Sequence, residues 1–335
     1  MNTLIPYENG FPTHTIIGKH DLKVRNALIK QLKPGDLFIN TTWIETGEQL
    51  DKALSQDFER LLLYSGIDWN ALPDFRPEVY EVLKSYPNIG VGNDLSGYYF
   101  SFWLDFVYEY LDNYVNFNPF DIKSEIKTYM CLNRKPHVHR QHVVKSLLDR
   151  GLQDKGYISL GQQKGFGIVY DIPIPIHLEN DIIDEIGDNS SFGVNTITND
   201  ITSVGHRDNW NNHFLNIVTE TTNTTTTFIS EKTFKPIIGK RPFIVLGDNY
   251  IYDILHKWGI DTFDDILGDG YKHPNFHYRM DWCVYVVETL SRDKHLDKLL
   301  LDLKPRLDQN LINLKEAAIS NRKDINNFYN TKSLL

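Results

Sequence analysis

Residues 214–248 read FLNIVTETTNTTTTFISEKTFKPIIGKRPFIVLGD, and their order of apolar and polar segments predicts a strand, a loop, a short helix and a second strand. Residues 214–218 favour the first strand. Residues 242–246 are apolar at every position, which is typical of a strand buried on both faces of a parallel sheet. Because proline lacks a backbone N–H, Pro236 indicates that the helix begins at Thr233 rather than at Ser230. The stretch therefore predicts a unit of a parallel α/β sheet.

Charged side chains of this unit are expected at one edge of the sheet. Ligands of parallel sheets bind where loops leave the carboxyl ends of strands, and a helix start there presents N–H groups to anions. The charged residues that would gather at this edge are Glu220, Glu231, Lys232 and Lys235. An alternative stays open, because Glu231 and Lys235 also have the four-residue spacing of an ordinary ion pair on a helix surface.

These residues resemble the donor-binding core of the GT-B glycosyltransferases, and most closely the fucosyltransferase-like pattern. That pattern has an acidic strand end, a Ser/Thr-Glu-Lys helix start and an apolar strand that ends in Leu-Gly, as residues 220, 230–232 and 242–247 do here. The resemblance implies that the glutamate and lysine hold the ribose and phosphates of a nucleotide-sugar. The donor-binding residues that it implies in this segment are Glu220, Ser230, Glu231, Lys232 and Lys235.

A second basic segment follows an earlier predicted strand. Residues 126–132 favour a strand, and residues 137–150 favour a helix with one apolar face. Arg134, Lys135 and Arg140 would then lie at a helix start on the same edge, where a pyrophosphate binds. The segment also resembles the opening of the fucosyltransferase donor domain, which implies that Arg140 is the phosphate-binding arginine. A solvent-facing helix residue is the alternative for Arg140.

The first 120 residues alternate between predicted strands and helices, which indicates a parallel sheet covered by helices. The predicted strands are 36–40, 60–64 and 88–92, and the predicted helices are 21–32, 48–59 and 76–85. Loops that follow two of these strands contain Glu45 and Asp94. In GT-B enzymes this half binds the acceptor, so the resemblance makes Asp94 and Glu45 candidates for the catalytic base. The sequence around Asp94 is also common turn chemistry.

The length of 335 residues predicts two domains, since domains average roughly 150 residues. We expect an acceptor-side Rossmann-like domain in residues 1–120 and a nucleotide-sugar-binding Rossmann-like domain in residues 121–310. Residues 311–335 are expected to form a C-terminal helix that packs back on the first domain, as in GT-B folds. Further predicted elements are strands at 156–160 and 260–263, a helix at 250–258, and mostly helix from 282 to 330.

Composition limits the class of protein. The net charge of −9 argues against a general nucleic-acid binder. No apolar run reaches the roughly 20 residues of a membrane span, and the first residues do not resemble a signal peptide, so we expect a cytoplasmic protein. Cys131 and Cys283 lie in apolar segments and are expected to be buried thiols. His137, His139 and His142 do not have a spacing that converges on one ion, so no metal site is expected.

The resemblance, together with these features, implies a GT-B glycosyltransferase with two Rossmann-like domains facing across a cleft. It would move a sugar from a nucleotide-sugar to an acceptor hydroxyl, with inversion, and without metal or cofactor because fixed cations neutralise the leaving diphosphate. The acceptor would be a glycan. The alternatives are a phage enzyme of the host cytoplasm that acts on hydroxymethylated DNA, a protein that binds sugar nucleotides without turnover, and a structural α/β protein. The oligomeric state stays open.

Overall fold

The structure is a computed structural model, and it divides the chain into two compact units. One comprises residues 1–109, 190–194 and 317–335, and the other, larger unit comprises residues 110–189 and 195–316. The predicted domain boundary at residue 120 and the packing of the C-terminal helix on the first domain stay predictions. The residues that the structure describes are 3–4, 26, 30, 34–40, 47–55, 57, 60–64, 78, 81–82, 104, 108, 119–122, 125–133, 135–161, 207–221, 223 and 229–330.

The larger unit contains a parallel sheet of four strands in the order β5-β4-β6-β7. Its strands are β4 (Lys127–Asn133), β5 (Gly156–Leu160), β6 (His213–Thr219) and β7 (Phe243–Leu246). In the register, Cys131 pairs with Ile158, and Ile217 pairs with Ile244. Every residue of β6 and β7 is buried, as expected for strands covered on both faces. The predicted α/β class with a parallel sheet is therefore confirmed.

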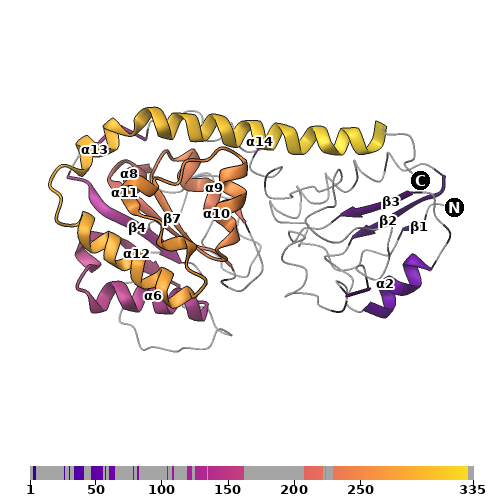
Figure 1. The fold of residues 1–335 in the computed structure, drawn as a ribbon, viewed down its shortest axis with the longest axis horizontal. Coiled ribbons are helices and arrows are strands. Elements are labelled where there is room, and N and C mark those ends of the chain that lie inside the picture. Colours follow the sequence, from indigo (N-terminus) through magenta and orange to yellow (C-terminus); the bar gives the residue numbers. More distant parts are fainter. Residues whose placement is uncertain are drawn as a thin grey trace. The chain divides into compact units, whose positions relative to one another are not determined.

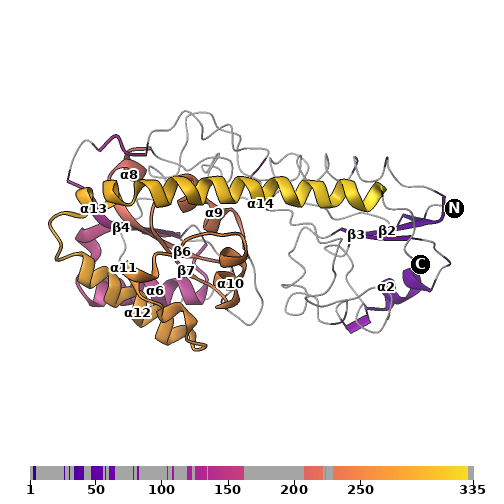
Figure 2. The same ribbon diagram turned by 45° about the horizontal axis from the view of Figure 1, so that its top comes forward.

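Helices cover both faces of this sheet. Figures 1 and 2 show α6 (Val138–Asp149) and α12 (Phe276–Leu290) together on one face, and α9 (Glu231–Ile238) and α13 (Leu296–Asp302) on the other. This arrangement follows from right-handed crossovers, because the β4-α6-β5 and β6-α9-β7 connections run in opposite directions across the sheet. The other helices are α8 (Arg207–Asn211), α10 (Tyr250–Lys257), α11 (Asp264–Leu267) and α14 (Lys304–Asn330).

The core of the larger unit is aromatic and aliphatic. Phe214, Phe234 and Phe243 are fully buried around the sheet, and Cys131 and Cys283 are buried free thiols as predicted. Burial raises the pKa of the Cys131 thiol to about 11, so it behaves as a small apolar side chain at neutral pH.

A buried arginine organises the amino-terminal end of the sheet. Arg241 is fully buried just before β7, and its Nε donates to the His213 carbonyl at 2.8 Å. Its two terminal nitrogens donate to the carbonyls of Gly239, Lys240, Pro119 and Trp210. All five guanidinium N–H groups are thus used. Arg241 ties the segment before β4 to the starts of β6 and β7.

The smaller unit contains a parallel sheet in the order β1-β2-β3. Its elements are β1 (Thr3–Leu4), β2 (Asp36–Asn40), β3 (Arg60–Tyr64) and the helix α2 (Gly47–Leu54). Strands β2 and β3 have their predicted bounds, while α2 ends five residues before the predicted end. The predicted strand at 88–92 lies outside the described residues.

Two local predictions in the larger unit are wrong. Helix α9 begins at Glu231, not at Thr233, because Ser230 adopts an extended conformation and its side chain accepts a hydrogen bond from the Lys232 N–H. Pro236 is tolerated inside this short helix. The predicted strand at 260–263 is a turn instead, in which Phe263 is left-handed and its N–H donates to the Asp261 carboxylate. The apolar residues Ile260 and Phe263 give this segment a local sequence pattern that is also typical of a strand.

Among the described helices, none combines the length and the apolar character that crossing a membrane requires.

Candidate functional site

The order of the strands creates a topological switch point between β4 and β6. Strand β4 comes first in this sheet, but its successor β5 lies on one side of it and the next strand, β6, lies on the other. The helices that follow β4 and β6, α6 and α9, therefore lie on opposite faces of the sheet (Figures 1 and 2). Ligands of open α/β sheets bind at such a topological switch point.

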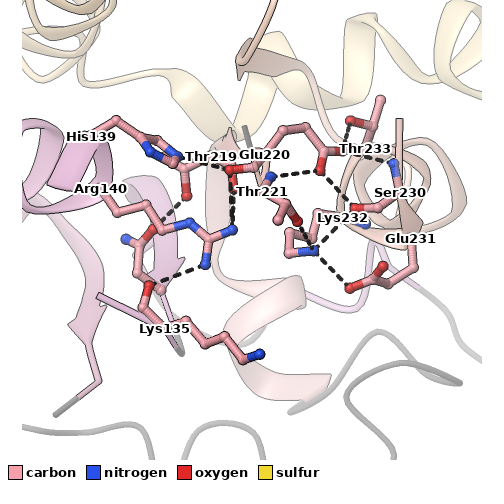
Figure 3. A network of polar contacts seen from close by, with 11 residues as sticks. Lys135, His139, Arg140, Thr219, Glu220, Thr221, Ser230, Glu231, Lys232 and Thr233 are labelled. Carbon is pink, nitrogen blue, oxygen red and sulfur yellow. Dashed lines mark hydrogen bonds and ion pairs between the residues drawn. The ribbon is translucent and has the colours of Figure 1, made fainter. Parts of the chain in front are cut away.

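At the end of β6, the Glu220 carboxylate is fully buried and joined to the start of α9 (Figure 3). Its Oε1 accepts from the Ser230 N–H at 3.0 Å and from the Thr233 hydroxyl at 2.6 Å. Its Oε2 accepts from the Ser230 hydroxyl at 2.7 Å and from the Thr221 N–H at 3.3 Å. These four bonds use the carboxylate as an acceptor on both oxygens. Glu220 thus fixes α9 to the end of β6.

Arg140 makes the corresponding link between α6 and β6. Its guanidinium is buried and donates to the Lys135 carbonyl at 3.1 Å and to the Thr219 and Glu220 carbonyls, each at 3.1 Å. His139 adds a bond of 2.8 Å from Nε2 to the Glu220 carbonyl, which can only accept. The start of α6 is therefore fastened to the end of β6 across the switch point, as Figure 3 shows. The buried hydrogen bonds of Glu220, Arg140 and His139 form a frame that joins α6, β6 and α9.

Lys232 lies beside this frame and is partly open to solvent. Its ammonium group donates to the Ser230 hydroxyl and to Glu231 Oε1, each at 3.1 Å, and its side chain is 33% exposed. Glu231 itself is buried. In Figure 3 the Lys135 side chain extends from its loop towards the side on which Lys232 and Glu231 lie. Two lysines, one in the loop after β4 and one in the first turn of α9, thus lie near the switch point (Figure 3).

Two histidines at the start of α6, His137 and His139, have lowered pKa values beside the basic residues of the site. For His137, burial is the main cause, and the charges of Arg140, Lys135 and Lys232 add to it; together they lower the pKa of His137 to about 3. Burial also lowers the pKa of His139 to about 4, although its bond to the Glu220 carbonyl opposes the shift. Both rings are neutral at pH 7. A protein with a net charge of −9 therefore gathers basic groups at one edge of its sheet.

The structure brings several of the predicted site residues together. Arg140, Glu220, Ser230, Glu231 and Lys232 form one connected network. Direct contact of these residues with a ligand stays a prediction.

The remaining predicted site residues differ in what the structure shows. Lys235 lies half-buried in α9, one turn after Glu231. Arg134, Asp94 and Glu45 lie outside the described residues.

Sequence reasoning missed the contribution of Thr233, His137 and His139 to this network. Thr233 has no signal of its own, because a threonine in the first helical turn is common. The two histidines follow Lys135 at a helix start on the predicted ligand edge, and that position was the available signal.

The chemistry of the site rests on its own residues. No protein-family model, curated protein or solved structure matches this chain. Within the part of the chain that the structure describes, no three His, Cys, Asp or Glu side chains are placed to hold a metal ion. Lysines beside a rigid frame of hydrogen bonds favour the binding of an anion with several oxygens, such as a diphosphate.

Proposed function

We propose that the protein is a glycosyltransferase that moves a sugar from a nucleotide-sugar donor to an acceptor hydroxyl, and that the donor binds at the β4/β6 switch point. The observation that carries this proposal is that Arg140 and Lys232 belong to one hydrogen-bonded network at that point, with the Lys135 side chain extending towards it (Figure 3). It supports the binding of a diphosphate. The fucosyltransferase-like order of Glu220, Ser230-Glu231-Lys232 and residues 242–247 supports the glycosyltransferase class and a GT-B arrangement.

The network suggests how the donor-binding residues divide their work. Arg140 and Glu220 are buried and bonded to the backbone and to hydroxyl groups, so we assign them to holding the frame. Lys232 and Lys135 are the proposed diphosphate contacts, and Glu231 is the proposed ribose contact. Fixed positive charge stabilises the transition state because negative charge grows on the diphosphate as the bond to the sugar breaks.

The acceptor side of the reaction follows from the resemblance alone. A carboxylate from the first 120 residues, Asp94 or Glu45, is the proposed base that deprotonates the acceptor hydroxyl in an inverting displacement. A glycan is the proposed acceptor, and hydroxymethylated DNA is the alternative to be compared in the same assay.

A ligand panel tests the proposal. Sugar nucleotides of UDP, GDP, CMP and dTDP should be compared by thermal shift, since a ligand at 100 times its Kd stabilises the folded state by about 2.7 kcal/mol. Stabilisation by one nucleotide class is expected. If none of the four classes changes the melting temperature, the donor site is refuted. Transfer to glycan and to hydroxymethylated DNA then distinguishes an enzyme from a binding protein.

Two variants test the proposed contacts. Lys232→Ala should weaken a nucleoside diphosphate by roughly 10- to 100-fold, the effect of losing one charged hydrogen bond, and should spare the free nucleoside. Glu231→Gln should weaken both ligands, because both carry the ribose. Lys257→Ala is the control, since that lysine is exposed at the end of α10. If Lys232→Ala weakened the nucleoside diphosphate and the free nucleoside equally, a contact of Lys232 with the phosphates would be contradicted.

A further inference from the structure

His137 lies at the start of α6, where its backbone is hydrogen-bonded and its ring packs on His139. The His137 N–H donates to the Lys135 carbonyl at 2.9 Å, and its own carbonyl accepts from the N–H groups of Arg140 and Gln141 at 2.9 and 3.0 Å. Its ring stacks on the His139 ring with 5.7 Å between centroids and 27° between planes. Because His139 is held by the Glu220 carbonyl, the His137 ring rests on the same frame as the rest of the site.

The basic groups whose electrostatic effect reaches this ring come from both sides of the switch point. Lys135, His139 and Arg140 belong to the loop after β4 and to α6, and Lys232 belongs to α9. Lys135, Arg140 and Lys232 are positively charged, and they disfavour a positive charge on His137 in the ligand-free protein. The ring is half-buried, so part of it is open to solvent.

We propose that His137 is a further anion-contacting residue of this site, and that its ring takes up a proton when a diphosphate binds. The identity of the anion as a diphosphate rests on the proposed function. A bound diphosphate would offset the repulsion from the three charged groups and would place oxygen acceptors beside the ring. An anion within about 4–6 Å favours the charged form of a histidine.

The direction of the pH dependence follows from linkage. The pKa of His137 in the free protein is about 3, and the bound anion raises it. At a pH between these two values, binding takes up a proton, so affinity rises as pH falls, by at most tenfold per pH unit for one proton. Reciprocally, the proton binds more tightly to the complex than to the free protein.

Inorganic pyrophosphate is the probe, and the experiment is isothermal titration of the full chain at pH 6, 7 and 8. At each pH, two buffers with different ionisation enthalpies give the number of protons taken up. Pyrophosphate protonates by itself, and this background is common to all variants. The result expected is a fractional proton uptake by the wild type that His137→Gln lacks, together with an affinity loss of about tenfold at pH 6 in that variant.

Two further variants make the test specific. His137→Arg carries a permanent charge. Once the protonation of pyrophosphate itself is subtracted, this variant should bind as tightly at pH 8 as at pH 6, and the protein should take up no proton. His142→Gln is the matched control, because His142 lies on the next turn of α6 and its ring contacts His277. It should behave as the wild type. Far-ultraviolet circular dichroism checks that each variant is folded.

The outcomes separate this inference from the proposed function. If nucleoside diphosphates bind while His137→Gln shows the wild-type affinity and proton count, the inference is overturned and the function stands. If pyrophosphate binds with His137-dependent proton uptake but no sugar nucleotide binds, the function fails and the inference stands. If the folded wild type binds neither pyrophosphate nor nucleoside diphosphates at any pH, both are overturned.

Discussion

At the scale of single residues, the site contains two kinds of charged side chain. Glu220 and Arg140 are buried and are joined to groups of the protein itself, because a buried charge is tolerated only when it is hydrogen-bonded. Lys232 keeps a third of its side chain in solvent. A change at Glu220 should therefore act first on the stability of the frame, and a change at Lys232 should act first on ligand affinity.

Glu220→Gln tests the role of the buried carboxylate. The glutamine amide would turn an N–H₂ group towards two of the four donors that now point at Glu220, so these donors lose their acceptor. We expect the free energy of unfolding to fall by about 1–3 kcal/mol, measured by urea titration. Glu316→Gln makes the same chemical change at an exposed position of α14 and should stay within about 0.5 kcal/mol of the wild type. Equal stability of both variants would contradict the role of Glu220.

Arg241→Met tests the buried arginine at the opposite end of the sheet. The methionine fills part of the volume but leaves the carbonyls of His213, Gly239 and Lys240 without this donor. We expect a loss of about 3 kcal/mol in the free energy of unfolding, seen as a lower urea midpoint by tryptophan fluorescence. Arg292→Met, at a side chain that is 72% exposed, should leave the midpoint almost unchanged. A similar small shift in Arg241→Met would show that the five bonds contribute little.

At the scale of elements, the structure offers a matched pair of helix starts. Asn275 caps α12, where its side chain accepts from the N–H groups of His277 and Tyr278 at 2.8 and 3.4 Å. Asn249 precedes α10, whose residues are all described, and its side chain makes no capping hydrogen bond there. The same residue type thus occurs once with the capping interaction and once without it.

Asn275→Ala and Asn249→Ala together measure the contribution of the cap. The first variant should lose about 1 kcal/mol of unfolding free energy, because two N–H groups of α12 lose their acceptor. The second variant should lose only about 0.3 kcal/mol of unfolding free energy. Asn275→Asp keeps the acceptor oxygens and should recover most of the stability. Equal losses in the two alanine variants, determined by urea titration, would contradict the assignment.

At the scale of the whole molecule, buried neutral histidines link stability to acid. Burial and the Arg241 charge hold the pKa of His213 well below its usual value of 6.5, and burial lowers that of His139 to about 4. A histidine with a depressed folded-state pKa binds its proton more readily when unfolded. Its stabilisation is therefore fully present above pH 6.5 and is lost as pH falls below that value.

We expect the thermal midpoint to fall steadily between pH 6.5 and pH 4.5. Each such histidine changes the free energy of unfolding by at most about 1.4 kcal/mol per pH unit. His139→Gln should reduce the slope in this window, while His295→Gln, which changes an exposed histidine, should not. A pH-independent midpoint in the wild type across the window would refute the linkage.

Much of the sheet was predictable from local pattern. Residues 36–40, 60–64 and 156–160 are strands with their predicted bounds, since short apolar runs bounded by turn residues favour strands on local grounds. The turn at 260–263 was not predictable in this way. The apolar residues Ile260 and Phe263 suit a strand in sequence, and both are buried. The Asp261 carboxylate, however, accepts a hydrogen bond from the Phe263 N–H and closes a turn.

The sequence by itself determined the α/β class, the strand bounds above and the gathering of basic residues at strand ends, because each depends on neighbours within one segment. Only the tertiary structure decided that β4 lies between β5 and β6, and that Arg140 reaches Glu220, 80 residues further along the chain. That contact makes Arg140 part of the frame. Burial and hydrogen-bond partners across such separations arise from packing, and a local pattern of residues does not contain them.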